Sequence, residues 1–109
     1  MDQKMCLESQ VVMVSTEEHL LSIMNKSSKV VLDFFAFWSN PINTVERIQN
    51  IANTHTDIQF ILINAEESFD LLQHYVVSDL PTLIFFVNGV EEARVCEPPD
   101  EAINKLLSH

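Results

Sequence analysis

The chain has 109 residues, and 6 Lys/Arg against 16 Asp/Glu give a formal net charge of −10 at pH 7. Hydrophobic residues make up 47% of it, too many for an acidic disordered tail and enough for one core, so we expect a single domain over residues 1–109. The negative charge repels phosphate backbones and anionic lipids, which argues against nucleic-acid and membrane partners. The single glycine, Gly89, leaves no glycine-rich phosphate loop, so no cofactor is expected.

The sequence predicts neither a membrane-spanning helix nor a secretory leader. No uncharged apolar run reaches about 18 residues, and the first residues, Met1–Leu7, include Asp2 and Lys4. The two cysteines, Cys6 and Cys96, form no C-x-x-C motif, and the four histidines lack metal-ligand spacing, so no metal site is expected. Two free thiols in a reducing compartment are favoured, with a Cys6–Cys96 disulfide as the alternative. We therefore expect a cytoplasmic protein, with the nucleus as a further location.

Strand and helix patterns alternate in the first part of the chain. Gln10–Val14 is apolar enough for a strand, and Ser15 with Glu18 three residues later forms a capping box that predicts a helix start. Lys29–Phe37 is β-branched and aromatic on both faces, which is typical of a central strand covered on both sides.

The middle of the chain predicts a helix, a strand and a second helix. Asn40 is a capping residue and Pro41 suits a first turn, so a helix begins here and runs to about His55. Asp57–Asn64 predicts a second buried strand. Ser68–Tyr75 predicts a short helix from the spacing of its apolar side chains, Phe69, Leu72 and Tyr75.

The last part of the chain predicts a hairpin and a final helix. Thr82–Val87 and Val90–Val95 are joined by Asn88-Gly89, the residue pair that favours a type I′ turn. Beyond Glu97–Asp100 an amphipathic helix is expected from its apolar residues, Ala102, Ile103, Leu106 and Leu107. This order predicts an α/β fold with a central mixed sheet of about five strands flanked by four helices.

Two local signatures add a family resemblance to this order. Val31–Trp38 resembles the strand that leads into the active site of thioredoxins, and Leu80-Pro81-Thr82 resembles the loop whose proline is cis in that family. Asn88-Gly89 falls where thioredoxins place their hairpin turn. The chain therefore resembles the thioredoxin superfamily over nearly its whole length, and the resemblance implies the thioredoxin fold.

The active-site motif departs from that family. Members carry W-C-G-P-C, whereas the five positions here are Trp38, Ser39, Asn40, Pro41 and Ile42. The family's chemistry needs a thiolate at a helix N-terminus and a second thiol that resolves the mixed disulfide. The hydroxyl of Ser39 is too weakly acidic to ionise there, and Ile42 has no reactive atom. The resemblance therefore implies a redox-inactive member, without dithiol or monothiol oxidoreductase activity and without catalytic residues.

Asp33 matches the buried carboxylate that accepts a proton from the resolving cysteine of thioredoxins. Because this chain has no cysteine at that position, two interpretations remain. Asp33 is either a relic whose pKa is raised by apolar surroundings, or a carboxylate that hydrogen-bonds to a lysine or to water.

The resemblance also implies a surface that binds extended peptide. In the thioredoxin fold, the loop at Trp38–Ile42 and the loop at Leu80–Thr82 lie side by side. This face would present a protein partner with six side chains, those of Phe37, Trp38, Ile42, Leu80, Pro81 and Thr82. The alternative is that Phe37 packs back onto Trp38 and only fills space.

Within the superfamily, the chain is most similar to the N-terminal thioredoxin-like domain of multidomain monothiol glutaredoxins. The likeness rests on Asn64–Glu67, on Tyr75 and on the phenylalanine-rich Leu83–Val87. It implies an alternative function as a targeting or regulatory domain in iron–sulfur homeostasis or redox regulation, with a glutaredoxin domain beyond His109. A third hypothesis is residual thiol chemistry through Cys96.

The acidic residues fall in two clusters. The first consists of Glu66, Glu67 and Asp70, and the second of Glu91, Glu92, Glu97, Asp100 and Glu101. Each is typical of a solvated face, and the alternative is a basic partner that is steered to the second cluster.

Overall fold

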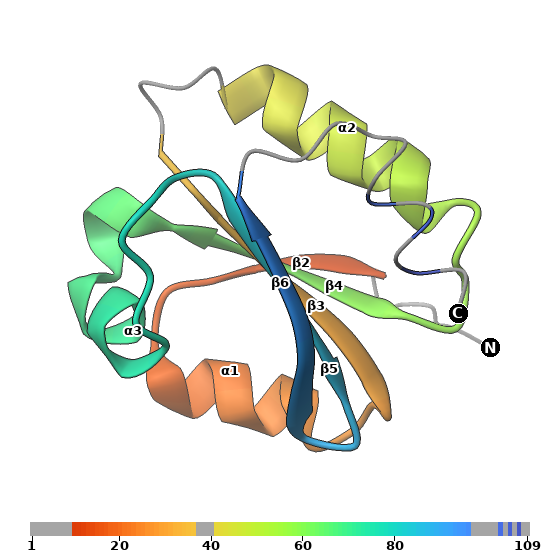
Figure 1. Ribbon diagram of the computed structural model, residues 1–109, viewed down its shortest axis with the longest axis horizontal. Coiled ribbons are helices and arrows are strands. Elements are labelled where there is room, and N and C mark those ends of the chain that lie inside the picture. The colour runs from red at the N-terminus through yellow and green to blue at the C-terminus, as the bar shows by residue number, and fades with distance from the viewer. Residues whose placement is uncertain (1–9, 37–40, 97–102, 104, 106, 108–109) are drawn as a thin grey trace, which may run out of the picture.

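The structure is a computed structural model that describes residues 10–36, 41–96, 103, 105 and 107, with only the backbone at residues 41–44 (Figure 1). Five strands form one mixed sheet in the order β2-β4-β3-β5-β6. β2, β4 and β3 are parallel, and the last two strands run antiparallel to their neighbours. The strands are β2 (Val11–Val14), β3 (Lys29–Phe35), β4 (Gln59–Asn64), β5 (Thr82–Val87) and β6 (Val90–Cys96). The predicted five-stranded mixed sheet is confirmed.

Helices cover both faces of this sheet. Three α-helices and a 3-10 turn are described: α1 (Glu17–Met24), α2 (Pro41–Ala52), η2 (Ala65–Glu67) and α3 (Phe69–His74). α2 lies on one face, and α1 and α3 lie on the other (Figure 1). The predicted fourth helix falls mostly outside the described residues, although Ile103, Lys105 and Leu107 are helical and Ile103 is fully buried. No helix in the described part of the chain is long and apolar enough to cross a membrane.

The central strand β3 separates two hydrophobic clusters. Val31 and Phe35 face the side covered by α2, where they join Ile48 and Ile51. The alternate residues of β3 face the opposite side, with Leu20 of α1 and Leu71 of α3. Both faces of β3 are therefore buried, as its sequence predicts.

The ends of three predicted elements differ from the structure. The N-cap of α1 is Thr16 rather than Ser15, because the Thr16 side chain accepts the amide hydrogen of His19 at 3.2 Å. β3 ends at Phe35 and not at Phe37, which lies outside the described residues. β4 begins at Gln59 rather than Asp57, since the backbone N–H of Ile58 is bound in a turn to His55 O.

The apolar face of α3 is also different from the prediction. Phe69 was expected on the buried side, but its side chain is 70% exposed, and Leu71 occupies the core instead. The helix has six residues and follows a 3-10 turn, so the spacing of three apolar side chains does not determine its orientation.

The hairpin and the proline loop agree with their signatures. Asn88 and Gly89 both have positive φ, at 51° and 83°, as a type I′ turn requires. The backbone N–H of Asn88 also donates to Ser28 O at 2.6 Å, which joins the turn to the start of β3. The Leu80–Pro81 peptide bond is cis.

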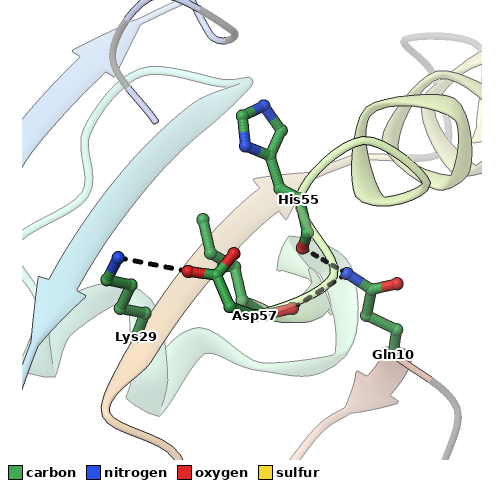
Figure 2. A network of polar contacts seen from close by, with 5 residues as sticks. Gln10, Lys29, His55 and Asp57 are labelled. Atoms are coloured by element: carbon green, nitrogen blue, oxygen red, sulfur yellow. Dashed lines mark hydrogen bonds and ion pairs between the residues drawn. The ribbon is translucent and has the colours of Figure 1, made fainter. Parts of the chain in front are cut away.

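A polar network joins the start of β2 to the end of α2 (Figure 2). The side-chain amide of Gln10 donates to three backbone carbonyls, those of Ala52 at 2.9 Å, His55 at 2.5 Å and Ile58 at 3.1 Å. These carbonyls belong to the last residue of α2 and to the turn that follows it, where those of Ala52 and His55 also accept backbone N–H groups of the turn. Gln10 therefore closes the C-terminal end of α2 onto the sheet.

Candidate functional site

The candidate site residues that the structure describes in the loop Leu80–Thr82 lie at one edge of the sheet, here called the carboxyl edge. The parallel strands β2, β4 and β3 end there, at Val14, Asn64 and Phe35. Thr82 begins β5 opposite Phe34, and Cys96 ends β6 opposite Thr82. In open α/β sheets, binding sites form outside the carboxyl ends of the strands, so this edge is the candidate functional site.

Part of the predicted motif lies outside the described residues. Phe37, Trp38, Ser39 and Asn40 are in this group, and of Ile42 only the backbone is described. Pro41 is the first residue of α2, as the predicted helix start requires. The two described positions of the motif, 41 and 42, therefore open α2.

The cis-proline loop forms the other side of the site. Leu80 and Pro81 are half-buried, and Leu80 packs against the cluster beneath α1 and α3. Thr82 is 2% exposed, and its Oγ1 lies 2.5 Å from Asp79 O and 3.6 Å from the sulfur of Cys96. The Thr82 hydroxyl is thus engaged inside the loop, while Leu80 and Pro81 keep partly exposed surface.

Asp33 is a buried carboxyl group in the middle of the sheet. Its register neighbours are Leu62 on β4 and Leu83 on β5, and its place between Val31 and Phe35 directs it to the α2 side. Its Oδ1 has no hydrogen-bond partner among the described residues. Burial raises the pKa of Asp33 to about 7, against a smaller opposing effect of the Arg47 guanidinium.

Such a carboxyl can exchange a proton near neutral pH. Its pKa near 7 is suited to general acid–base work, provided that a second group at hydrogen-bond distance supplies or takes the proton. The raised pKa agrees with the first of the two interpretations of Asp33, in which apolar surroundings raise the pKa of the carboxyl group. Within residues 10–36 and 41–96, no cysteine other than Cys96 is available as such a partner.

Sequence reasoning did not connect Cys96 to this site. Cys96 is an exposed free cysteine that lies directly opposite Thr82. A β-bulge between Phe85 and Phe86 shifts the register by one residue, and without it Val95 would lie opposite Thr82. Pairing residues outward from the Asn88-Gly89 turn predicts that the end of β6 lies near the loop. It does not predict that Cys96 is the residue opposite Thr82.

The comparisons with known proteins agree with this geometry. The family model described as Thioredoxin matches residues 10–109. The chain belongs to the thioredoxin family. The thioredoxin of Mycoplasma genitalium is 32% identical over 85 residues, which cover 77% of this chain and 83% of that protein. Thioredoxin-2 of Saccharomyces cerevisiae is 32% identical over 95 residues, 86% of this chain and 91% of that protein.

Solved thioredoxin structures share the fold. The oxidised thioredoxin of Plasmodium falciparum has a TM-score of 0.81 at 23% identity, over 90% of this chain and 95% of that one. Fasciola hepatica thioredoxin gives 0.81 at 21% identity, over 88% of this chain and 95% of that one. The predicted thioredoxin fold is confirmed, whereas the likeness to the glutaredoxin N-terminal domain stays a prediction.

The described residues contain no group that resembles a metal site. In residues 10–36 and 41–96, no three His, Cys, Asp or Glu side chains lie close enough together to hold a metal ion. The chemistry that the described part of the edge offers is therefore that of the Asp33 carboxyl, the Cys96 thiol and the half-buried apolar surface at Leu80 and Pro81.

Proposed function

We propose that this member of the thioredoxin family is a redox-inactive protein-interaction module of the cytoplasm or nucleus. The single observation that carries the proposal is the motif itself, in which Ser39 and Ile42 stand at the positions of the two active-site cysteines. Thiol–disulfide exchange needs a thiolate that attacks and a thiol that resolves. Neither side chain supplies one.

The cis-proline loop supports this proposal, although both thiols are absent from the motif. The cis peptide at Leu80–Pro81 and the half-buried apolar surface of these two residues are the features that a bound extended peptide uses. The partner in this proposal is a protein segment that lies against Leu80, Pro81 and the Trp38–Ile42 loop. Asp33 has no thiol at position 42 to serve, so it has no catalytic role in the proposal.

An insulin-reduction assay with dithiothreitol tests the lost activity. We expect the wild-type protein to leave the dithiothreitol background unchanged, and the double variant Ser39→Cys plus Ile42→Cys to raise the rate well above it. The double variant shows that the fold still supports catalysis once both thiols return. The matched control is Ser39→Cys alone, which lacks the resolving thiol.

Either of two outcomes would overturn the proposed inactivity. A wild-type rate above background that disappears in Cys96→Ser would assign thiol chemistry to Cys96, the exposed cysteine beside Thr82. A wild-type rate that survives in Cys96→Ser would equally contradict the proposal.

A comparison of bound partners tests the interaction surface. Affinity capture with the wild type is compared with the variant Phe37→Asp plus Trp38→Ala, and the control is Val90→Asp, an exposed valine at the hairpin. We expect specific partners to be lost from the double variant alone. Identical partner sets from all three proteins would remove the proposed surface.

The alternative proposal is a targeting or regulatory domain of a monothiol glutaredoxin. It rests on the Asn64–Glu67 segment, in which the Asn64 side chain accepts the amide hydrogen of Glu66 at 3.1 Å and begins η2. The reading frame beyond His109 distinguishes the two proposals. A further domain with a C-G-F-S-type motif supports the alternative, and a stop codon contradicts it.

A further inference from the structure

An apolar groove lies along α3, outside the proposed peptide-binding surface. It encloses about 440 Å³ and is lined by Phe69, Leu72, Gln73, Val76, Val77 and Ser78. Two of its side chains are unusually exposed, with Phe69 at 70% and Val76 at 77%. Because it shares no residue with the Trp38–Ile42 or Leu80–Thr82 loops, we call it the α3 groove and treat it separately.

The position of Val76 is unfavourable for a valine. α3 ends in a Schellman motif, in which the N–H of Val77 donates to Leu72 O at 2.8 Å and the N–H of Val76 to Gln73 O at 3.2 Å. The residue at the position of Val76 takes a left-handed conformation, here with φ of 53°, and is ordinarily glycine. A β-branched residue with positive φ is an outlier that points to a role for its side chain.

A contact from the neighbouring strand holds Val76 in place. Nη1 of Arg94, on β6, donates to Val76 O at 2.9 Å. The remaining guanidinium nitrogens of Arg94 bind both carboxylate oxygens of Glu91 at 3.0 Å. The backbone of the strained turn is thus held by Arg94, and the Val76 side chain is 77% exposed.

An acidic hollow adjoins the groove at Phe69. This hollow of about 250 Å³ is lined by Ser15, Glu66, Glu67, Ser68, Phe69 and Asp70. Glu66, Glu67 and Asp70 are all exposed there. The hydroxyl of Ser68, another residue that lines the hollow, is buried and has no hydrogen-bond partner among the described residues.

We propose that the α3 groove and this hollow together bind a basic amphipathic segment of another protein. One large apolar side chain of that segment lies between Phe69 and Val76. Its flanking Lys or Arg side chains face the carboxylates of Glu66, Glu67 and Asp70. A second copy of this chain does not fit, because two acidic rims on chains of net charge −10 would face each other.

Two synthetic helical peptides test the proposal by amide chemical shifts of the full chain. The first has Leu at helical spacing (i, i+3, i+4, i+7) around one Trp and Lys at the other positions, and the second has Glu in place of every Lys. We expect the Lys peptide to shift the amides of Leu71–Ser78 to saturation, and the Glu peptide to leave them unchanged. No shift with the Lys peptide, or equal shifts with both, would overturn the proposal.

Substitutions distinguish binding of the peptide in the apolar α3 groove from electrostatic attraction alone. Phe69→Ser keeps every charge and is expected to weaken binding of the Lys peptide about tenfold or more. The matched control is Val90→Ser, another exposed apolar residue, which should bind as the wild type does. If Phe69→Ser also binds as the wild type, the peptide is held by charge alone and the groove is excluded.

Val76→Asn distinguishes a loss of peptide binding from a loss of protein stability. Asparagine tolerates positive φ, so this variant should unfold at a temperature no lower than the wild type and still lose affinity for the Lys peptide. A wild-type dimer in sedimentation that Phe69→Ser dissociates would instead assign the groove to a second copy and overturn the proposal.

Discussion

The two edges of the sheet differ in whether certain polar side chains have hydrogen-bond partners. At the amino edge, where β2 and β3 begin, Gln10 binds three carbonyls. Lys29 binds Asp57 there at 3.1 Å (Figure 2). Toward the carboxyl edge, Oδ1 of Asp33 and Oγ of Ser68 are buried without hydrogen-bond partners in the described part of the chain. A buried polar group left unpaired costs about 1–3 kcal/mol, so the two edges do not contribute equally to stability.

The unpaired polar groups lie near the two surfaces for which binding is proposed. Native proteins pair nearly all buried polar groups, and the exceptions mark catalytic or binding regions. Asp33 lies next to the cis-proline loop through its register with Leu83, and Ser68 lines the hollow beside Phe69. Removing a paired side chain at the amino edge should therefore lower stability, whereas removing the unpaired carboxylate of Asp33 should raise it.

Asp33→Asn is expected to have the largest effect. The pKa of Asp33 rises from 3.8 to about 7 on folding, so the folded state holds the proton more tightly than the unfolded state. Stability from this group is fully present below about pH 4 and is lost as pH rises to about 7, by about 4 kcal/mol in total. Asparagine carries no charge, so the free energy of unfolding at pH 8 should rise by about 2–4 kcal/mol.

Urea unfolding at a series of pH values measures this effect. The difference between Asp33→Asn and the wild type should be largest above pH 7 and shrink towards pH 4. Asp70→Asn, at an exposed carboxylate, is the control and should change the free energy of unfolding by about 0.5 kcal/mol or less. A variant that is less stable than the wild type at pH 8 would show that the Asp33 carboxylate has a partner when the protein is folded.

Gln10→Ala tests the amino edge. Removing the side-chain amide leaves the carbonyls of Ala52, His55 and Ile58 without this donor, and we expect a loss of about 1–3 kcal/mol in unfolding free energy. Gln49→Ala, on the exposed side of α2, is the matched control and should change stability by about 0.5 kcal/mol or less. Equal effects of both substitutions would mean that Gln10 does not secure the end of α2.

Val76→Gly tests the strain near α3 and should have a smaller effect of the opposite sign. A left-handed conformation costs a non-glycine residue about 1–2 kcal/mol, and the greater freedom of glycine in the unfolded chain offsets part of the gain. We expect a net stabilisation of about 0.5–1 kcal/mol, seen as a higher melting temperature. Val90→Gly, at an exposed strand position, should destabilise the protein instead.

The sequence predicts the fold better than it predicts the site, for a physical reason. The apolar run of β3, the Asn88-Gly89 turn and the cis-proline signature at Pro81 are local patterns, and each appears in the structure as expected. The position of Cys96 depends on one bulged residue in β6, which no local pattern marks. The exposure of Phe69 depends on how α3 is oriented after η2, which ends at Glu67.

Contacts between distant segments are the other feature that the sequence does not predict. Gln10 binds carbonyls more than forty residues away, and nothing in its own neighbourhood indicates this. The network becomes visible only when β2 and the end of α2 are brought together. Residues that secure such a junction resemble ordinary polar surface residues in a sequence.

Asp57→Asn should have the smallest effect, because the Lys29–Asp57 pair is exposed. The hydrogen bond from the Lys29 ammonium holds the pKa of Asp57 below 3.8, so this pair stabilises the folded state above about pH 4 and ceases to do so as pH falls through the lowered pKa. The urea midpoint of the variant should be slightly lower at pH 7 in low salt and equal to that of the wild type in 1 M NaCl, since salt screens exposed pairs. An undiminished difference at high salt would mean that Asp57 stabilises the amino edge through its turn rather than through Lys29.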